Sequence, residues 1–82
     1  METVLVIGAA RSGIAVSKLL LKNGYHVVLT DSNAIKEKTE LESMGIEVFD
    51  GGHPDSLKEK KYAIIVKNPG IPYRDPFVHY FV

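Results

Sequence analysis

The chain has 82 residues, enough for one small domain, and its ten basic and ten acidic residues leave no net charge. This balance does not favour nucleic acid as a partner. The absence of cysteine excludes disulfides and thiolate metal sites, and no apolar run approaches the roughly 20 residues that cross a membrane. These features predict a soluble, cytoplasmic protein that contacts neither nucleic acid nor membrane.

The first apolar run ends at a loop that contains two glycines. Val4–Ile7 is typical of a strand buried on both faces of a parallel sheet. The loop Gly8-Ala9-Ala10-Arg11-Ser12-Gly13 follows, and a helix is predicted from Ser12 to about Asn23. The first turn of such a helix leaves backbone N–H groups unpaired, which favours a phosphate there. The alternative is a tight turn whose glycines only let the helix pack on the sheet.

A second apolar strand, predicted over Val27–Thr30, ends at an acidic residue. Asp31 lies 23 residues after Gly8, close to the spacing at which an acidic side chain meets a ribose hydroxyl in nucleotide-binding βαβ units. The alternative is that Asp31 caps the following helix, which we expect over Ala34–Met44. The residues of that helix expected to face inward are Ile35, Leu41 and Met44.

Two further strands are predicted. Ile46–Phe49 has the mixed polarity of an edge strand, and Tyr62–Val66 is the fourth apolar run. His53, between them, is interpreted as a loop residue rather than a catalytic one. The loop Lys67–Pro72 contains two prolines and a glycine, and it leaves the sheet at the same edge as the first loop. Asp75 is predicted to cap a last helix.

These elements predict an α/β fold: a Rossmann-like open parallel sheet with strand order 3-2-1-4 and helices on both faces. In such sheets ligands bind in the crevice beside the first strand. The last helix is strongly apolar where the chain stops, so we expect residues 1–82 to be the N-terminal domain of a longer protein. An uncovered edge at Tyr62–Val66 would favour self-association, unless the helix over Phe77–Val82 shields it.

Four motifs then occur in order: Gly8-Ala9-Ala10-Arg11-Ser12-Gly13, Asp31-Ser32, Gly51-Gly52-His53-Pro54 and Lys67-Asn68-Pro69-Gly70-Ile71-Pro72. Together they resemble the N-terminal domain of the MurD family, the UDP-N-acetylmuramoyl-L-alanine:D-glutamate ligases of bacterial cell-wall synthesis. The resemblance covers nearly all of the chain. Its most specific part is the last motif, which is similar to the family's Asn/Ser-Pro-Gly-Ile loop.

The resemblance implies a three-domain enzyme of which this is the domain that holds the UDP end of UDP-N-acetylmuramoyl-L-alanine. ATP, Mg²⁺ and D-glutamate would bind mainly through the other domains, so this fragment alone is expected to be inactive. No catalytic, cofactor-binding or metal-binding residue is assigned to it. The resemblance assigns the diphosphate to Ala10, Arg11 and Ser12, the uridine to Asp31, Ser32 and Asn33, and the sugar-phosphate side to Asn68 and Gly70.

Two other classes of protein share part of this pattern. An NAD-binding domain of a dehydrogenase or of a ligand-sensing regulator has the same strand, loop, helix and acidic residue. Ala10 argues against it, because it replaces the glycine that lets a dinucleotide pyrophosphate approach the backbone. The loop Asn68–Ile71 argues against it as well. In a purely structural α/β module, the loop glycines and Asp31 would serve packing and capping alone.

Overall fold

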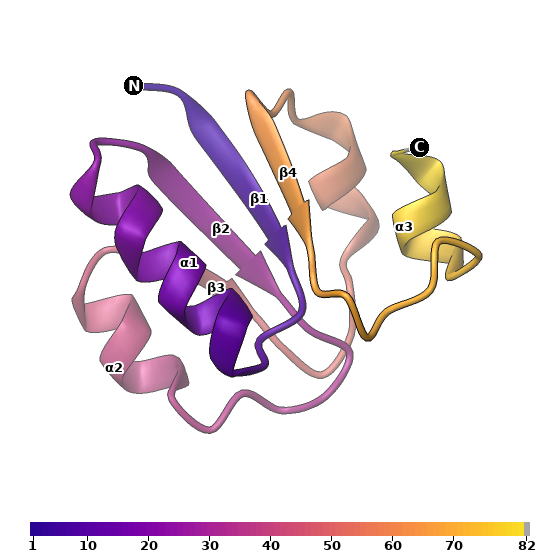
Figure 1. Ribbon diagram of the computed structural model, residues 1–82, viewed down its shortest axis with the longest axis horizontal. Coiled ribbons are helices and arrows are strands. Elements are labelled where there is room, and N and C mark those ends of the chain that lie inside the picture. Colours follow the sequence, from indigo (N-terminus) through magenta and orange to yellow (C-terminus); the bar gives the residue numbers. More distant parts are fainter. Residues whose placement is uncertain (82) are drawn as a thin grey trace.

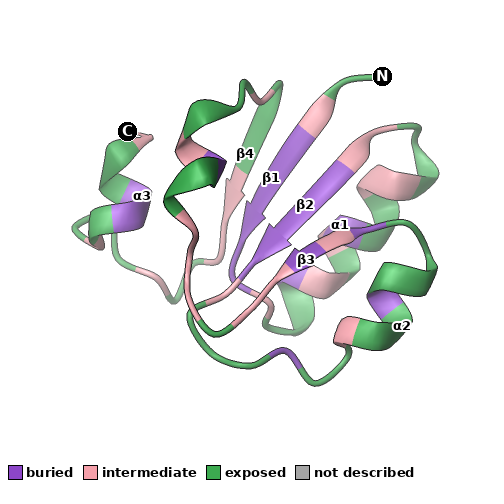
Figure 2. Ribbon diagram, turned by 180° about the vertical axis from the view of Figure 1, so that it is seen from behind, coloured by how far each residue is buried: buried purple, intermediate pink, exposed green. Residues whose placement is uncertain are grey.

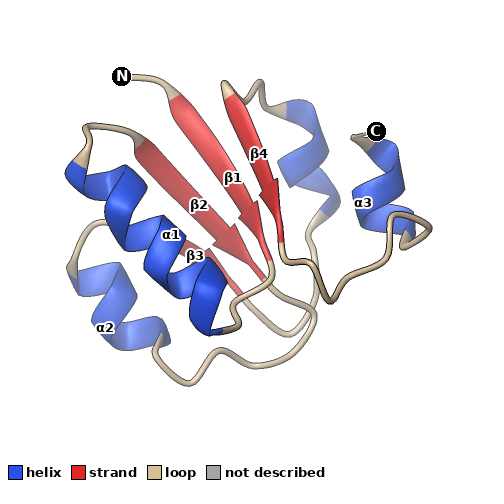
Figure 3. Ribbon diagram, in the orientation of Figure 1, coloured by secondary structure: helices blue, strands red, loops and turns tan. Residues whose placement is uncertain are grey.

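The computed structural model describes residues 1–81, and its centre is a four-stranded parallel sheet (Figures 1 and 3). The strand order is β3-β2-β1-β4, which confirms the predicted order. β1 pairs with β2 from Thr3 opposite His26 to Ile7 opposite Thr30. The strands are β1 (Thr3–Ile7), β2 (His26–Thr30), β3 (Glu47–Phe49) and β4 (Ile64–Lys67).

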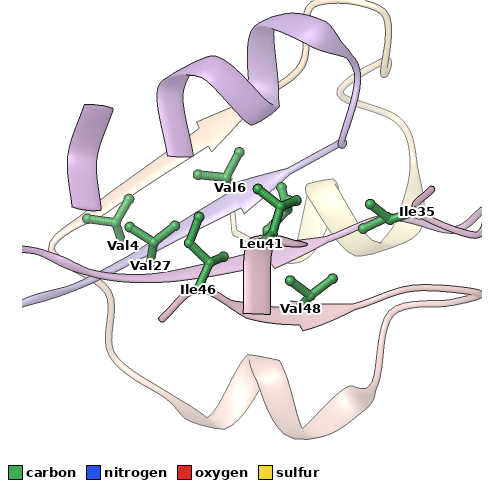
Figure 4. Packing of buried hydrophobic residues seen from close by; sticks show 8 residues of the cluster. Val4, Val6, Val27, Ile35, Leu41, Ile46 and Val48 are labelled. Carbon is green, nitrogen blue, oxygen red and sulfur yellow. The ribbon is translucent and has the colours of Figure 1, made fainter. Parts of the chain in front are cut away.

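One face of the sheet is covered by α1 (Arg11–Lys22) and α2 (Lys38–Ser43), as Figure 1 shows, and Figure 4 shows the side chains buried on this face. Alternate residues of the two central strands point to this face because side chains along a strand alternate between its two sides. Figure 2 shows burial concentrated along β1 and β2. The buried cluster comprises Val4, Val6, Val27, Leu29, Ile35, Leu41, Ile46 and Val48.

The opposite face is covered by a short 3-10 helix, η1 (Asp55–Glu59), and by α3 (Pro76–Tyr80). Asp75 accepts hydrogen bonds from the N–H groups of Phe77 and Val78, which confirms it as the cap of α3. The buried residues on this face are Leu5, Ile7, Val28, Leu57, Phe77 and Val78. Helices therefore cover both faces of the sheet, as predicted.

The helix expected over Ala34–Met44 is shorter in the structure, and Met44 does not face inward as predicted. It begins at Lys38, because the Asp50 carboxylate accepts the Ile35 N–H at 2.9 Å in the segment before it. At the other end, Gly45 adopts φ +103° and the N–H of Ile46 bonds the carbonyl of Leu41. This turn buries Ile46 in place of Met44, which is 42% exposed.

The outer strand β4 begins at Ile64, two residues later than predicted. Its residues Ile64 and Ile65 are 38% and 40% exposed, so α3 leaves both in contact with solvent. Val82, the last residue of the helix expected to shield this edge, lies outside the described residues. Self-association through the β4 edge stays a prediction. Among residues 1–81, no helix is long and apolar enough to cross a membrane.

We predict that Asp50 makes the stability of the fold sensitive to acid. The hydrogen bond from the Ile35 N–H lowers the pKa of Asp50 below its ordinary value of 3.8; desolvation opposes this shift and Lys38 adds to it. A lowered folded-state pKa stabilises the fold above the unfolded pKa, and this stabilisation is lost as pH falls through the folded pKa.

Urea denaturation at a pH of about 7 and of about 2.5 measures this effect. Asp50→Asn should lose less stability between the two pH values than the unmodified chain does. Asp55→Asn is the matched control, since Asp55 is 94% exposed and makes only a surface ion pair with Lys58. An equal pH dependence for Asp50→Asn and the unmodified chain would show that the Ile35 bond has no such role.

Candidate functional site

Three loops meet at the carboxyl edge of the sheet, at the lower side of Figure 1. They follow β1, β2 and β4, which are neighbours in the strand order. Parallel strands end at the same edge, so these loops lie side by side. All eight suggested site residues lie in these loops or in the first turn of α1, where Arg11 and Ser12 are: Ala10, Arg11, Ser12, Asp31, Ser32, Asn33, Asn68 and Gly70.

The two glycines of the first loop allow α1 to start directly against the end of β1. Gly8 has φ +104°, a backbone conformation that residues with a side chain rarely adopt. A Cβ on Gly13 would lie 2.1 Å from the carbonyl oxygen of Gly8, so no other residue fits there without moving the helix. The two glycines thus fix the position of the N-terminus of α1.

The first turn of α1 presents unpaired hydrogen-bond donors. The cap residue Ala10 supplies no side-chain bond, and the first backbone bond of the turn runs from Ile14 to Ala10. Among the described residues, no acceptor meets the N–H groups of Arg11, Ser12 and Gly13. These donors and the positive end of the helix dipole suit an anion.

Asp31 connects the first loop to the second. Its Oδ2 accepts the N–H of Ala9 at 2.7 Å, and its Oδ1 accepts the N–H of Asn33 at 2.8 Å. The alternative that Asp31 caps the next helix is wrong, because the cap position of α2 is Glu37. Each carboxylate oxygen has two lone pairs, so Asp31 keeps capacity to accept a further hydrogen bond.

The loop after β4 is tied to the first loop by Asn68. The N–H of Asn68 donates to the carbonyl of Ile7 at 2.9 Å, and its side-chain oxygen accepts the N–H of Gly70 at 2.9 Å. A Cβ on Gly8 would lie 2.6 Å from the Cβ of Asn68, so the two backbones approach closely. Asn68 therefore shapes its own loop while it packs against the glycine turn.

A groove of about 270 Å³ separates the start of α1 from the loop after β4. Ser12 and Gly13 border it on one side, and Asn68 and Pro69 border it on the other. Arg11 is exposed and forms no ion pair with a described residue, and Ser32 and Asn33 are exposed as well. The structure thus places Ser12 and Asn68 on the same groove, and it leaves Arg11, Ser32 and Asn33 open to solvent.

Lys67 was not among the predicted site residues, although it borders the same groove. Its ammonium group donates to the carbonyl of Ile71 at 2.6 Å and to that of Asn68 at 3.2 Å. It also lies 4.5 Å from the centre of the Tyr73 ring. Lys67 thereby links the start of the loop after β4 to Ile71 within the same loop. A lysine at a strand end gives no sequence signal for such a role.

We predict that replacing Asp31 with asparagine destabilises the fold. The amide nitrogen cannot accept a hydrogen bond, so either the Ala9 or the Asn33 N–H loses its partner. The expected loss in the free energy of unfolding is about 1–2 kcal/mol, measured by urea denaturation. Asp55→Asn, the same change on an exposed carboxylate, should cost less than about 0.5 kcal/mol. Equal stability of the two variants would count against the bridging role of Asp31.

No family model matches the chain. Curated relatives, however, align with nearly all of it. A UDP-N-acetylmuramoylalanine–D-glutamate ligase of Geobacillus kaustophilus is 47% identical over 78 residues, which is 92% of this chain and 17% of that protein. Ligases of the same name from Bacillus thuringiensis and Bacillus anthracis are 41% identical over 80 residues, 94% of this chain and 18% of theirs. These matches confirm the resemblance read from the motifs. The chain is homologous to UDP-N-acetylmuramoylalanine–D-glutamate ligases, the MurD family, over 92–94% of its own length, and it spans 17–18% of theirs.

Proposed function

We propose that this chain binds the UDP moiety of UDP-N-acetylmuramoyl-L-alanine as part of a ligase that adds D-glutamate in peptidoglycan synthesis. The observation that carries the proposal is the convergence of three loops around the open N-terminus of α1. Homology to ligases named for D-glutamate addition supports the choice of substrate.

The diphosphate is proposed to lie at the first turn of α1. The N–H groups of Arg11, Ser12 and Gly13 would donate to its oxygens, and the Ser12 hydroxyl would add a donor. Arg11 is exposed beside them and would contribute positive charge. The methyl group of Ala10 favours a ligand that does not press its phosphates onto the loop as a dinucleotide does.

The nucleoside is proposed to lie against the loop after β2. Asp31 is held in place by two backbone N–H groups, and its remaining lone pairs suit a ribose hydroxyl. Ser32 and Asn33 present small polar side chains that suit a pyrimidine edge. Asn68, which borders the groove, and Gly70, whose N–H it accepts, are proposed to lie on the sugar-phosphate side.

The complete ligase reaction is proposed to require parts of the enzyme other than this chain. We infer that ATP and Mg²⁺ bind to those parts, that D-glutamate is the amine substrate, and that the enzyme is cytoplasmic. The chain contains no Gly-Lys-Ser or Gly-Lys-Thr segment, the sequence that cradles ATP phosphates in such loops. These 82 residues by themselves are therefore expected to be inactive.

A titration monitored by amide chemical shifts tests the proposal. UDP, UDP-N-acetylmuramoyl-L-alanine and NAD are added separately to the 82-residue chain. Both UDP compounds should bind weakly, since contacts from the rest of the enzyme are lacking, and NAD should bind more weakly still. Shifts should be confined to residues 8–13, 31–33 and 68–70. Tighter binding of NAD than of either UDP compound would support the dehydrogenase alternative, and no binding of UDP would overturn the proposal.

A substitution at Arg11 tests the assignment of the diphosphate. Arg11→Ala should weaken UDP binding by about 1–2 kcal/mol at low salt and by less at high salt, because screening reduces the attraction between exposed charges. Lys22→Ala removes the same charge at the other end of α1 and should leave the affinity nearly unchanged. Isothermal titration calorimetry at two salt concentrations measures both. If Arg11→Ala behaves like Lys22→Ala, Arg11 does not contact the ligand.

A further inference from the structure

The motif Gly51-Gly52-His53-Pro54 has no place in the site described so far, yet it borders the proposed nucleoside loop. The N–H of Gly51 donates to the carbonyl of Asn33, and the N–H of Gly52 donates to the carbonyl of Asp31, both at 3.2 Å. The N–H of Asp31 in turn donates to the carbonyl of Phe49 at 3.0 Å. The glycine pair therefore holds the backbone of the loop after β2 through two hydrogen bonds.

Gly51 and Gly52 cannot by themselves keep their N–H groups aligned with the carbonyls of Asn33 and Asp31. Gly51 has φ +72° and Gly52 has φ +143°, and an added Cβ on either would meet no atom within 4 Å. Glycine samples many backbone conformations when no neighbour confines it. The segment needs an anchor beside the pair if its N–H groups are to stay aligned with the two carbonyls.

His53 supplies that anchor through two contacts. Its Nδ1 lies 2.7 Å from the hydroxyl oxygen of Thr30, a residue with no solvent exposure at the end of β2. Its ring stacks on the ring of Phe77 in α3, with centres 4.3 Å apart and planes 12° from parallel. Phe77 is itself 93% buried, as its relative exposure is 7%. His53 is thus held by a strand on one side and by a helix on the other.

We propose that His53 is a positioning residue for nucleoside recognition. It fixes the Gly51–Gly52 pair, and this pair holds the backbone of Asp31–Asn33 in the shape that meets a uridine. The proposal rests on the function proposed above and adds a specificity element to the same site. His53 is not expected to touch the ligand or to act in catalysis.

The test compares a ligand that has a nucleoside with one that lacks it. His53→Phe keeps the stacked ring and removes Nδ1, and Thr30→Val removes the hydroxyl and keeps the shape of the side chain. In each variant the dissociation constant for UDP should rise about three- to tenfold, the range that one lost hydrogen bond produces. The dissociation constant for inorganic pyrophosphate should stay within about twofold, because the N-terminus of α1 is untouched.

Tyr62→Phe is the matched control. It removes the hydrogen bond from the Tyr62 hydroxyl to the carbonyl of Leu57, on the same side of the sheet but away from residues 31–33. It should lower stability as the test variants do, yet leave the ratio of UDP to pyrophosphate affinity unchanged. A similar ratio in His53→Phe and Tyr62→Phe would overturn the proposal.

A second readout needs no ligand. In His53→Phe and in Thr30→Val, the amide hydrogens of Gly51 and Gly52 should exchange faster than in the Tyr62→Phe control, because their alignment with Asp31 and Asn33 is loosened. Unchanged exchange at both glycines would overturn the positioning role. If the unmodified chain fails to bind UDP, the proposed function is wrong, and the exchange rates alone decide whether His53 fixes the loop.

Discussion

The close approach of Gly13 to the carbonyl of Gly8 determines where the candidate site lies. No side chain separates α1 from the end of β1, so the helix begins directly at the edge of the sheet. Its first three N–H groups, which no described residue accepts, consequently lie at the edge where the neighbouring strands end. A larger residue at Gly13 would push the helix away from the end of β1, whereas one at Gly8 would clash with Asn68 in the loop after β4.

The loops around this helix end are preorganised by polar side chains that bond to backbone. Asp31 uses both oxygens on N–H groups of two different loops, and Asn68 closes the turn that contains Gly70. Because these bonds lie within the protein, they reduce the ordering that binding requires. The exposed side chains of Arg11, Ser32 and Asn33 are left to make contacts outside the fold.

The face of the sheet opposite α1 connects to the same edge through aromatic contacts. Phe77 packs in the core of that face, stacks on His53, and lies 5.3 Å from Phe81, centre to centre. His53 in turn meets the last residue of β2, directly before Asp31. The Phe77 ring, the His53 ring and the Thr30 hydroxyl therefore form a continuous chain of contacts from α3 to the end of β2.

The sequence by itself determined the elements whose signals are local. Continuous apolar runs predicted the central strands, the glycine spacing predicted the first turn and helix, and Asp75-Pro76 predicted the start of α3. The parallel direction of the strands followed from these elements, because strands that alternate with helices favour crossover connections. The motifs also pointed to the correct family of relatives.

Only the tertiary structure decided the features that depend on partners distant in the chain. The late start of α2 reflects the bond from Ile35 to Asp50, which is 15 residues away. The two bonds of Asp31, one of them to a residue 22 positions earlier, excluded its role as a helix cap. The contact between His53 and Thr30 joins residues 23 positions apart. Local pattern does not encode such pairs, because each depends on how the folded strands bring their loops to one edge.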